Sequence, residues 1–113
     1  MKVAITAIAD GWKEKVDTRF GRAKGFFIVD SENNQTEYID NSNNVEAGHG
    51  AGTSAAQLVI EAGVKILITN ELGPKAGAVL KTAGINIFTS KENTTVEEAY
   101  NRYKNDELTE QSL

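Results

Sequence analysis

The strongest constraint on the fold is a short repeat in the second half of the chain. Residues 62–66 (Ala-Gly-Val-Lys-Ile) and 83–87 (Ala-Gly-Ile-Asn-Ile) both join an apolar helix end, a glycine and the start of an apolar strand. Before each segment, apolar residues recur at helical spacing. Two successive helix–strand units place neighbouring strands parallel, with right-handed crossovers. The repeat therefore predicts a layered α/β fold.

The other elements follow from spacing and from capping or turn residues. Strands are predicted over residues 2–8, 26–30, 36–40, 64–69 and 85–89, and helices over 55–62, 74–83 and from Thr94 or Thr95 onward. Ser54 with Gln57 is a candidate capping pair, Pro74 suits the first helical position, and Thr95 with Glu98 fits a capping box. The expected order is β-β-β-α-β-α-β-α, a mixed five-stranded sheet in one domain over residues 1–106, with residues 107–113 as a frayed tail.

Composition excludes several classes of protein. The formal net charge is -4 and the 12 basic residues are scattered, which argues against nucleic acid as a partner. No apolar stretch approaches the roughly 20 residues of a membrane-spanning helix, and the N-terminus has no signal-peptide pattern, so a cytoplasmic protein is expected. Cysteine is absent, which excludes thiolate-ligated zinc, cysteine-ligated iron–sulfur centres and cysteine nucleophiles.

The first candidate binding segment lies in the long loop after the first strand. There Arg19 and Arg22 flank Phe20 and Gly21, so planar donors for anionic oxygens stand beside a backbone that a ligand can approach closely. Ligands of open α/β sheets bind beyond the carboxyl ends of the strands, which is where this loop lies. The alternative is a solvated turn in which Asp17 pairs with Arg19 or Arg22.

Two further segments are expected at the same edge. Gly50 and Gly52 precede a helix whose positive end attracts anions, although the sequence lacks the Lys and the GK[ST] ending of a Walker loop. His49, the only histidine, is either a metal ligand or a solvent-exposed loop residue. Asn70 and Gly73 open the next helix, and simple capping is the alternative for them.

Catalytic motifs are missing. The sequence contains no GxSxG elbow, HExxH or CxxC, and no acid is placed to orient a single histidine. A non-enzymatic binding protein is therefore expected. Two alternatives stay open: a regulatory or scaffold module that binds a small phosphate-containing metabolite or a partner protein, and a hydrolase that uses Asp17 or Asp10.

Several segments in a fixed order carry a family resemblance. They are the first strand, residues 19–23 (Arg-Phe-Gly-Arg-Ala), 49–52 (His-Gly-Ala-Gly), 63–69, Gly73-Pro74, 83–85 and 95–99 (Thr-Val-Glu-Glu-Ala). Together they resemble the dinitrogenase iron-molybdenum cofactor biosynthesis family, which includes the nitrogenase accessory factors NifX and NifY and the C-terminal domain of NifB. The resemblance runs through nearly the whole chain and implies a ribonuclease-H-like, three-layer α/β/α fold.

The resemblance also implies a function. It points to an accessory protein that binds and delivers an anionic iron-molybdenum or iron–sulfur cluster precursor, with cluster-assembly proteins as partners and no tightly bound cofactor. Many family members have a histidine where this chain has Arg19, which leaves His49 as the one candidate metal ligand. The expected binding residues are Arg19, Phe20, Gly21, Arg22, His49, Gly50, Gly52, Asn70 and Gly73.

Overall fold

The computed structural model describes residues 1–45 and 50–111 of the chain. Its centre is a six-stranded sheet with the order β3-β2-β1-β4-β5-β6. The strands are β1 (Lys2–Ala7), β2 (Gly25–Asp30), β3 (Thr36–Asp40), β4 (Val64–Thr69), β5 (Asn86–Thr89) and β6 (Thr109–Glu110). β4 runs parallel to β1 and β5, whereas the other neighbours pair antiparallel. The predicted α/β class and mixed sheet are confirmed.

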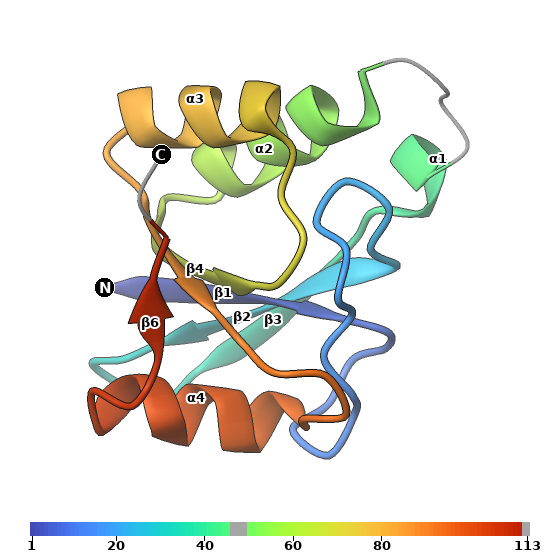
Figure 1. Cartoon of the computed structure of the whole chain (residues 1–113). Coiled ribbons are helices and arrows are strands. Elements are labelled where there is room, and N and C mark those ends of the chain that lie inside the picture. The colour runs from blue at the N-terminus through green and yellow to red at the C-terminus, as the bar shows by residue number, and fades with distance from the viewer. Residues whose placement is uncertain (46–49, 112–113) are drawn as a thin grey trace.

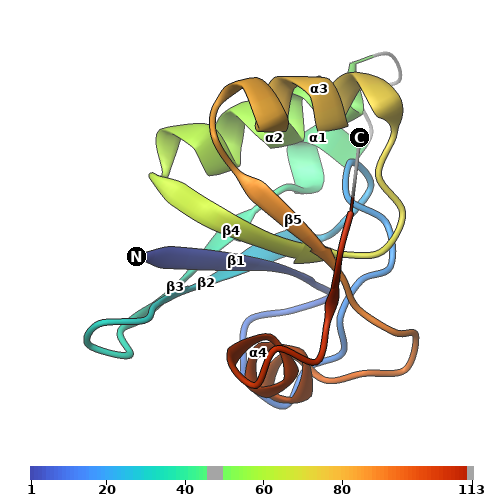
Figure 2. The ribbon, with the colours of Figure 1, turned by 60° about the vertical axis from the view of Figure 1, so that its left-hand side comes forward.

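Helices cover both faces of the sheet. They are α1 (Ser42–Val45), α2 (Ala51–Glu61), α3 (Pro74–Thr82) and α4 (Val96–Lys104). The long helices α2 and α3 lie on one face and α4 lies on the other, which gives three layers (Figure 1, Figure 2). Within the described part of the chain, no helix is long and apolar enough to cross a membrane.

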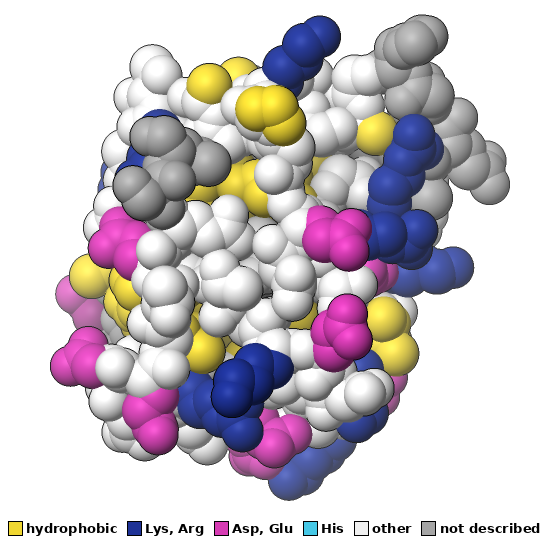
Figure 3. All heavy atoms as spheres, in the orientation of Figure 1, with side chains coloured by type: hydrophobic (Ala, Val, Ile, Leu, Met, Phe, Trp, Pro, Cys, Tyr) yellow, Lys and Arg dark blue, Asp and Glu magenta, His cyan; other side chains and the backbone are white. Residues whose placement is uncertain are grey.

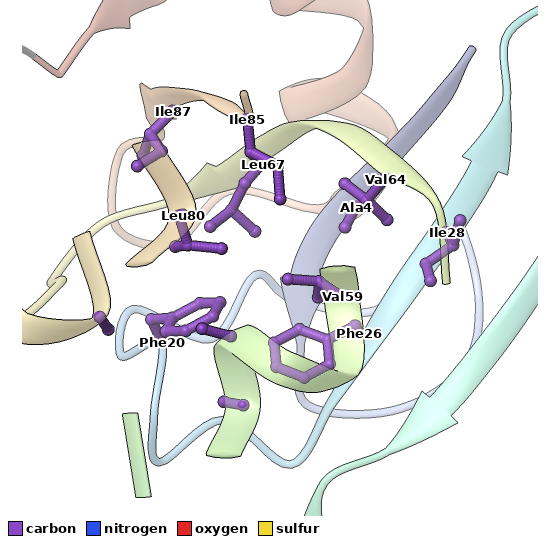
Figure 4. Packing of buried hydrophobic residues seen from close by; sticks show 13 residues of the cluster. Ala4, Phe20, Phe26, Ile28, Val59, Val64, Leu67, Leu80, Ile85 and Ile87 are labelled. Atoms are coloured by element: carbon purple, nitrogen blue, oxygen red, sulfur yellow. The ribbon is translucent and has the colours of Figure 1, made fainter. Parts of the chain in front are cut away.

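The core is divided by the sheet into two apolar clusters. Along β1, Val3 and Ile5 belong to the cluster beneath α4, whereas Ala4 belongs to the cluster beneath α2 and α3. This alternation follows from the two-residue period of a strand. Both faces are apolar because both are covered, as expected for a central strand. Figure 4 shows the second cluster, in which Phe20 and Phe26 pack with residues of the two helices.

The start of α2 differs from the prediction. The helix begins at Ala51, with Gly50 as its N-cap at φ 83°, rather than at the expected pair of Ser54 and Gln57. Glycine adopts this left-handed conformation without steric cost, so the helix starts four residues before the predicted position. Gly52 therefore lies in the first turn of a helix and not in a loop.

The expected five strands are corrected to six. The additional strand, β6, lies within residues 107–113, the predicted frayed tail, and it pairs with β5 through Phe88↔Glu110 and Thr89↔Thr109. The Gln111 N–H donates to the carbonyl oxygen of Ile87 at 2.7 Å, which continues this pairing. The segment is polar and exposed and has no strand periodicity. Its order comes from backbone pairing with the edge of β5, which periodicity cannot reveal.

The structure confirms the predicted capping box of α4, and its contribution to the free energy of unfolding can be measured. The Glu98 N–H donates to Thr95 Oγ1 at 3.1 Å, and the Thr95 N–H donates to Glu98 Oε1 at 3.0 Å. We expect Thr95→Ala to lower the free energy of unfolding by about 1 kcal/mol in urea denaturation. An unchanged value would contradict the assignment of this cap.

The same cap has a defined pH dependence. Hydrogen bonds from the backbone and side chain of Thr95 lower the pKa of Glu98 below its ordinary value. A lowered carboxyl pKa stabilises the fold above the pKa of the unfolded chain, and this contribution is lost as the pH falls through the folded-state pKa. The difference in stability between wild type and Thr95→Ala should therefore shrink in acid.

Candidate functional site

Three segments that are distant in the sequence meet at one hollow. It has a volume of ≈ 460 Å³, within the roughly 300–1,000 Å³ typical of small-molecule sites. We call it the glycine-lined hollow. Its lining residues come from the loop of residues 17–24, the start of α2 and the start of α3: Phe20, Gly21, Arg22, Gly50, Ala51, Gly52, Thr53, Gly73, Pro74, Lys75 and Ala76. The predicted convergence of three segments is seen in the structure.

At the hollow, the 17–24 loop and the start of α2 approach each other at two glycines, with no side chain between them. A Cβ atom on Gly21 would lie 2.9 Å from both Cα and N of Gly52, closer than real Cβ contacts. A Cβ atom on Gly52 would in turn lie 3.3 Å from Cβ of Ala76, at the start of α3. The loop and the two helices therefore pack at a point where no side chain fits between the loop and α2. These glycines are needed for the close approach.

No side chain among the described residues caps the two helices that begin at the hollow. α2 and α3 have Gly50 and Gly73 as N-caps, and among the described residues neither cap forms a side-chain hydrogen bond. Neither helix has an acidic residue in its first turn. α4, in contrast, has a complete capping box of Thr95 and Glu98, and both Glu97 and Glu98 lie in its first turn. The first N–H groups of a helix have no partner within the helix and carry its positive end. Two such ends at one hollow favour an anion.

The charged side chains that line the hollow are positive, as are the N-terminal ends of the two helices. The lining includes the exposed side chains of Arg22 and Lys75, and no Asp or Glu is among the lining residues that the structure describes. Figure 3 shows Lys and Arg side chains at the side of the molecule where the 17–24 loop lies, with Asp or Glu side chains beside them. The chain as a whole has a formal net charge of -4, so this local excess of positive charge is not a property of the average surface.

The structure brings together most of the predicted binding residues. Those that line the glycine-lined hollow are Phe20, Gly21, Arg22, Gly50, Gly52 and Gly73. His49 lies outside the described residues. Sequence reasoning missed Thr53 and Lys75, which line the same hollow. Lys75 follows the Gly73-Pro74 helix start directly, and its place in the first turn is the signal that would have identified it.

Arg19 and Asn70 lie elsewhere. Arg19 lines a different hollow, and its Nε lies 3.7 Å from Oδ1 of the buried Asp17, which is the ion pair named above as the alternative. The Asn70 Nδ2 donates to the backbone carbonyl oxygen of Ser90 at 2.8 Å, and the backbone carbonyl oxygen of Asn70 accepts from Gln111 Nε2 at 3.1 Å. Asn70 therefore links β4 to β5 and to the C-terminal segment.

The donor set of the hollow suits hydrogen bonding to an anion. Across residues 1–45 and 50–111, no group of three or more His, Cys, Asp or Glu side chains could hold a metal ion. The hollow instead offers backbone N–H groups, a guanidinium and an ammonium group. Such donors form charge-assisted hydrogen bonds to oxygen or sulfide atoms that a bound anion already carries. They fit a cluster that brings its own ligands.

These features define a small three-layer α/β domain with a positively polarised, glycine-lined hollow at two helix N-termini. The family model for dinitrogenase iron-molybdenum cofactor matches residues 1–106. The chain belongs to the dinitrogenase iron-molybdenum cofactor family.

Similar proteins agree with this membership. The apo form of the orange protein from Desulfovibrio gigas is 38% identical, with a TM-score of 0.95, and the match covers 98% of this chain and 92% of that chain. A candidate NifB protein from Thermotoga is 31% identical, with a TM-score of 0.85, and the match covers 96% of this chain and 91% of that chain. An uncharacterized protein of Methanocaldococcus jannaschii is 38% identical over 84 aligned residues, and the match covers 72% of this chain and 69% of the relative.

Proposed function

We propose that this protein is a non-enzymatic accessory protein that carries an anionic iron-molybdenum or iron–sulfur cluster precursor in the glycine-lined hollow. One observation carries the proposal: two helices without side-chain caps among the described residues begin at a hollow lined by Arg22 and Lys75 and by no described acid. Membership in the dinitrogenase iron-molybdenum cofactor family supports a metal cluster as the anion. Cytoplasmic residence and delivery to cluster-assembly proteins belong to the same proposal.

The hollow would hold its cargo by charge and hydrogen bonds. First-turn N–H groups of α2 and α3 would donate to terminal or bridging sulfides, while Arg22 and Lys75 would balance the negative charge. Both basic side chains are exposed, so the cargo would stay accessible to a receiving protein. These weak, reversible contacts suit delivery better than permanent redox work. His49, next to the N-cap Gly50 in sequence, is the imidazole that would ligate a metal of the cargo.

Two alternatives to the carrier function fit the structure to different degrees. Helix N-termini bind phosphate as readily as other anions, so a small phosphate-containing metabolite is the second candidate for this hollow. A hydrolase based on Asp17 is disfavoured, because that carboxylate is buried and accepts the backbone N–H groups of Arg19 and Lys24. An acid with both oxygens engaged in this way is poorly placed to activate water.

Anaerobic uptake tests the proposal. Wild-type protein is mixed with a chemically prepared iron-molybdenum or iron–sulfur precursor and separated by gel filtration, and the chromophore is expected to elute with the protein. Arg22→Ala should weaken uptake about tenfold, since one charge-assisted hydrogen bond contributes roughly 1.5 kcal/mol. His49→Ala should also weaken it. Arg102→Ala, on α4 across the sheet, is the matched control and should bind as the wild type does.

Two results would contradict this function. If the wild type takes up neither precursor, the carrier assignment is wrong. If a nucleotide or sugar phosphate raises the melting temperature at concentrations where the precursors do nothing, the metabolite alternative replaces it.

A further inference from the structure

The 17–24 loop, which forms one wall of the glycine-lined hollow, is held from two sides by buried polar side chains. Asp17 is 7% exposed and Asn41 is 1% exposed. Neither residue is among those that line the hollow. Burying polar groups costs free energy unless they form hydrogen bonds, so the partners of these two side chains indicate what they are for.

Asp17 holds the ends of the loop through its acceptors. Oδ1 accepts from the N–H of Arg19 at 3.2 Å, and Oδ2 accepts from the N–H of Lys24 at 3.3 Å. The position of Asp17 is set by the sheet, because Thr6 Oγ1 on β1 donates to the carbonyl oxygen of Asp17 at 2.6 Å. One carboxylate thus joins the first and the last part of the loop and anchors both to β1.

Asn41 holds the middle of the loop through its donors. Its Nδ2 donates to the carbonyl oxygen of Gly21 at 3.3 Å and to that of Ala23 at 2.9 Å. The Asn41 N–H donates to the carbonyl oxygen of Lys24 at 2.9 Å. Because a trans peptide is planar, fixing the carbonyl of Gly21 also fixes the N–H of Arg22 on the opposite side of the same plane.

We propose that Asp17 and Asn41 are positioning residues of the cargo site, which hold the peptide planes of the 17–24 loop so that Gly21 reaches Gly52 and Arg22 lines the hollow. The inference rests on the proposed function. Asp17 supplies only acceptors and Asn41 supplies donors, and the two act on different peptides of one loop. Their effect on binding passes through the loop backbone, since neither touches the hollow.

Two substitutions separate positioning from bulk stability. Asp17→Asn replaces one acceptor oxygen by an amide nitrogen, and Asn41→Ala removes both donors without adding a buried charge. Each should weaken uptake of the iron–sulfur precursor by up to about tenfold, the effect expected for losing the charge-assisted hydrogen bond of Arg22. Thr95→Ala, a cap on the far side of the sheet, is the control for lost stability and should retain wild-type affinity.

Two further readouts address the loop itself. Circular dichroism of the bound chromophore should change in both variants, since it reports how the cargo is oriented and a uniform loss of stability leaves it unaltered. The double variant should lose less than the sum of the two single losses, because either substitution already frees the same loop.

The outcomes are distinct. If the wild type binds the precursor and both variants bind it within twofold of Thr95→Ala, the positioning inference is wrong and the carrier function stands. If the wild type binds no precursor, the carrier function fails and this inference fails with it. Should either variant be too unstable to assay, the other decides the question alone.

Discussion

Replacing Phe20 with alanine is expected to lower the free energy of unfolding by about 3–5 kcal/mol, the usual cost of truncating a fully buried phenylalanine. Phe20 is 1% exposed and lies 5.4 Å, centroid to centroid, from the ring of Phe26. It belongs to the cluster beneath α2 and α3, and it also lines the hollow. Its removal should leave a cavity where the 17–24 loop packs on the two helices.

Chemical denaturation followed by far-UV circular dichroism measures this change. Phe20→Leu is the graded control, because leucine keeps most of the apolar volume and should cost much less than alanine. Precursor uptake by Phe20→Ala, measured below its unfolding transition, should also fall. A loss below about 1 kcal/mol would mean that the loop is not anchored through this ring.

The second large effect is expected for Gly21→Ala, because the added methyl group has no room at this position. The new Cβ would meet backbone atoms of Gly52 at 2.9 Å, and backbone in a helix cannot swing aside as a flexible side chain can. Overpacking of this kind costs about 1–3 kcal/mol. The loop and the start of α2 should be forced apart, so precursor uptake should fall more steeply than stability.

Gly73→Ala is the matched control for this change. Gly73 lines the same hollow, but a Cβ atom there would have nothing within 4 Å, and its φ of -68° suits any residue. The free energy of unfolding of the Gly73→Ala variant should fall by less than about 1 kcal/mol, the difference between glycine and alanine as N-cap residues. Equal effects of the two substitutions on stability would show that the contact between Gly21 and Gly52 does not limit packing.

Much of the fold could be predicted because its signals are local. The glycines that end α2 and α3, Gly63 and Gly84, have φ of +80° and +82°, which is the conformation that makes glycine the usual helix stop. Pro74 starts α3 and Thr95 caps α4, as their positions indicated. β6 could not be predicted, because its strand character comes only from pairing with β5.

The site could be predicted in part for a similar reason. Glycines next to helix starts identified two walls of the hollow, and the Arg-Phe-Gly-Arg segment identified the third. Arg19 and Arg22 are three residues apart, and only the conformation of the loop separates them into different hollows. The role of Asn41 could not be predicted, because it stands in an asparagine-rich stretch typical of exposed loops. In the structure it is buried.

Under the proposed function, the first turns of α2 and α3 would make the lifetime of the protein depend on whether cargo is bound. An anion that joins the two helix ends binds only the folded chain, and at a hundredfold excess over its Kd it would add about 2.7 kcal/mol to folding. Proteases remove the unfolded fraction, so the empty form would be degraded sooner than the loaded form. The amount of this protein in a cell would then follow the supply of its cargo without any change in gene expression.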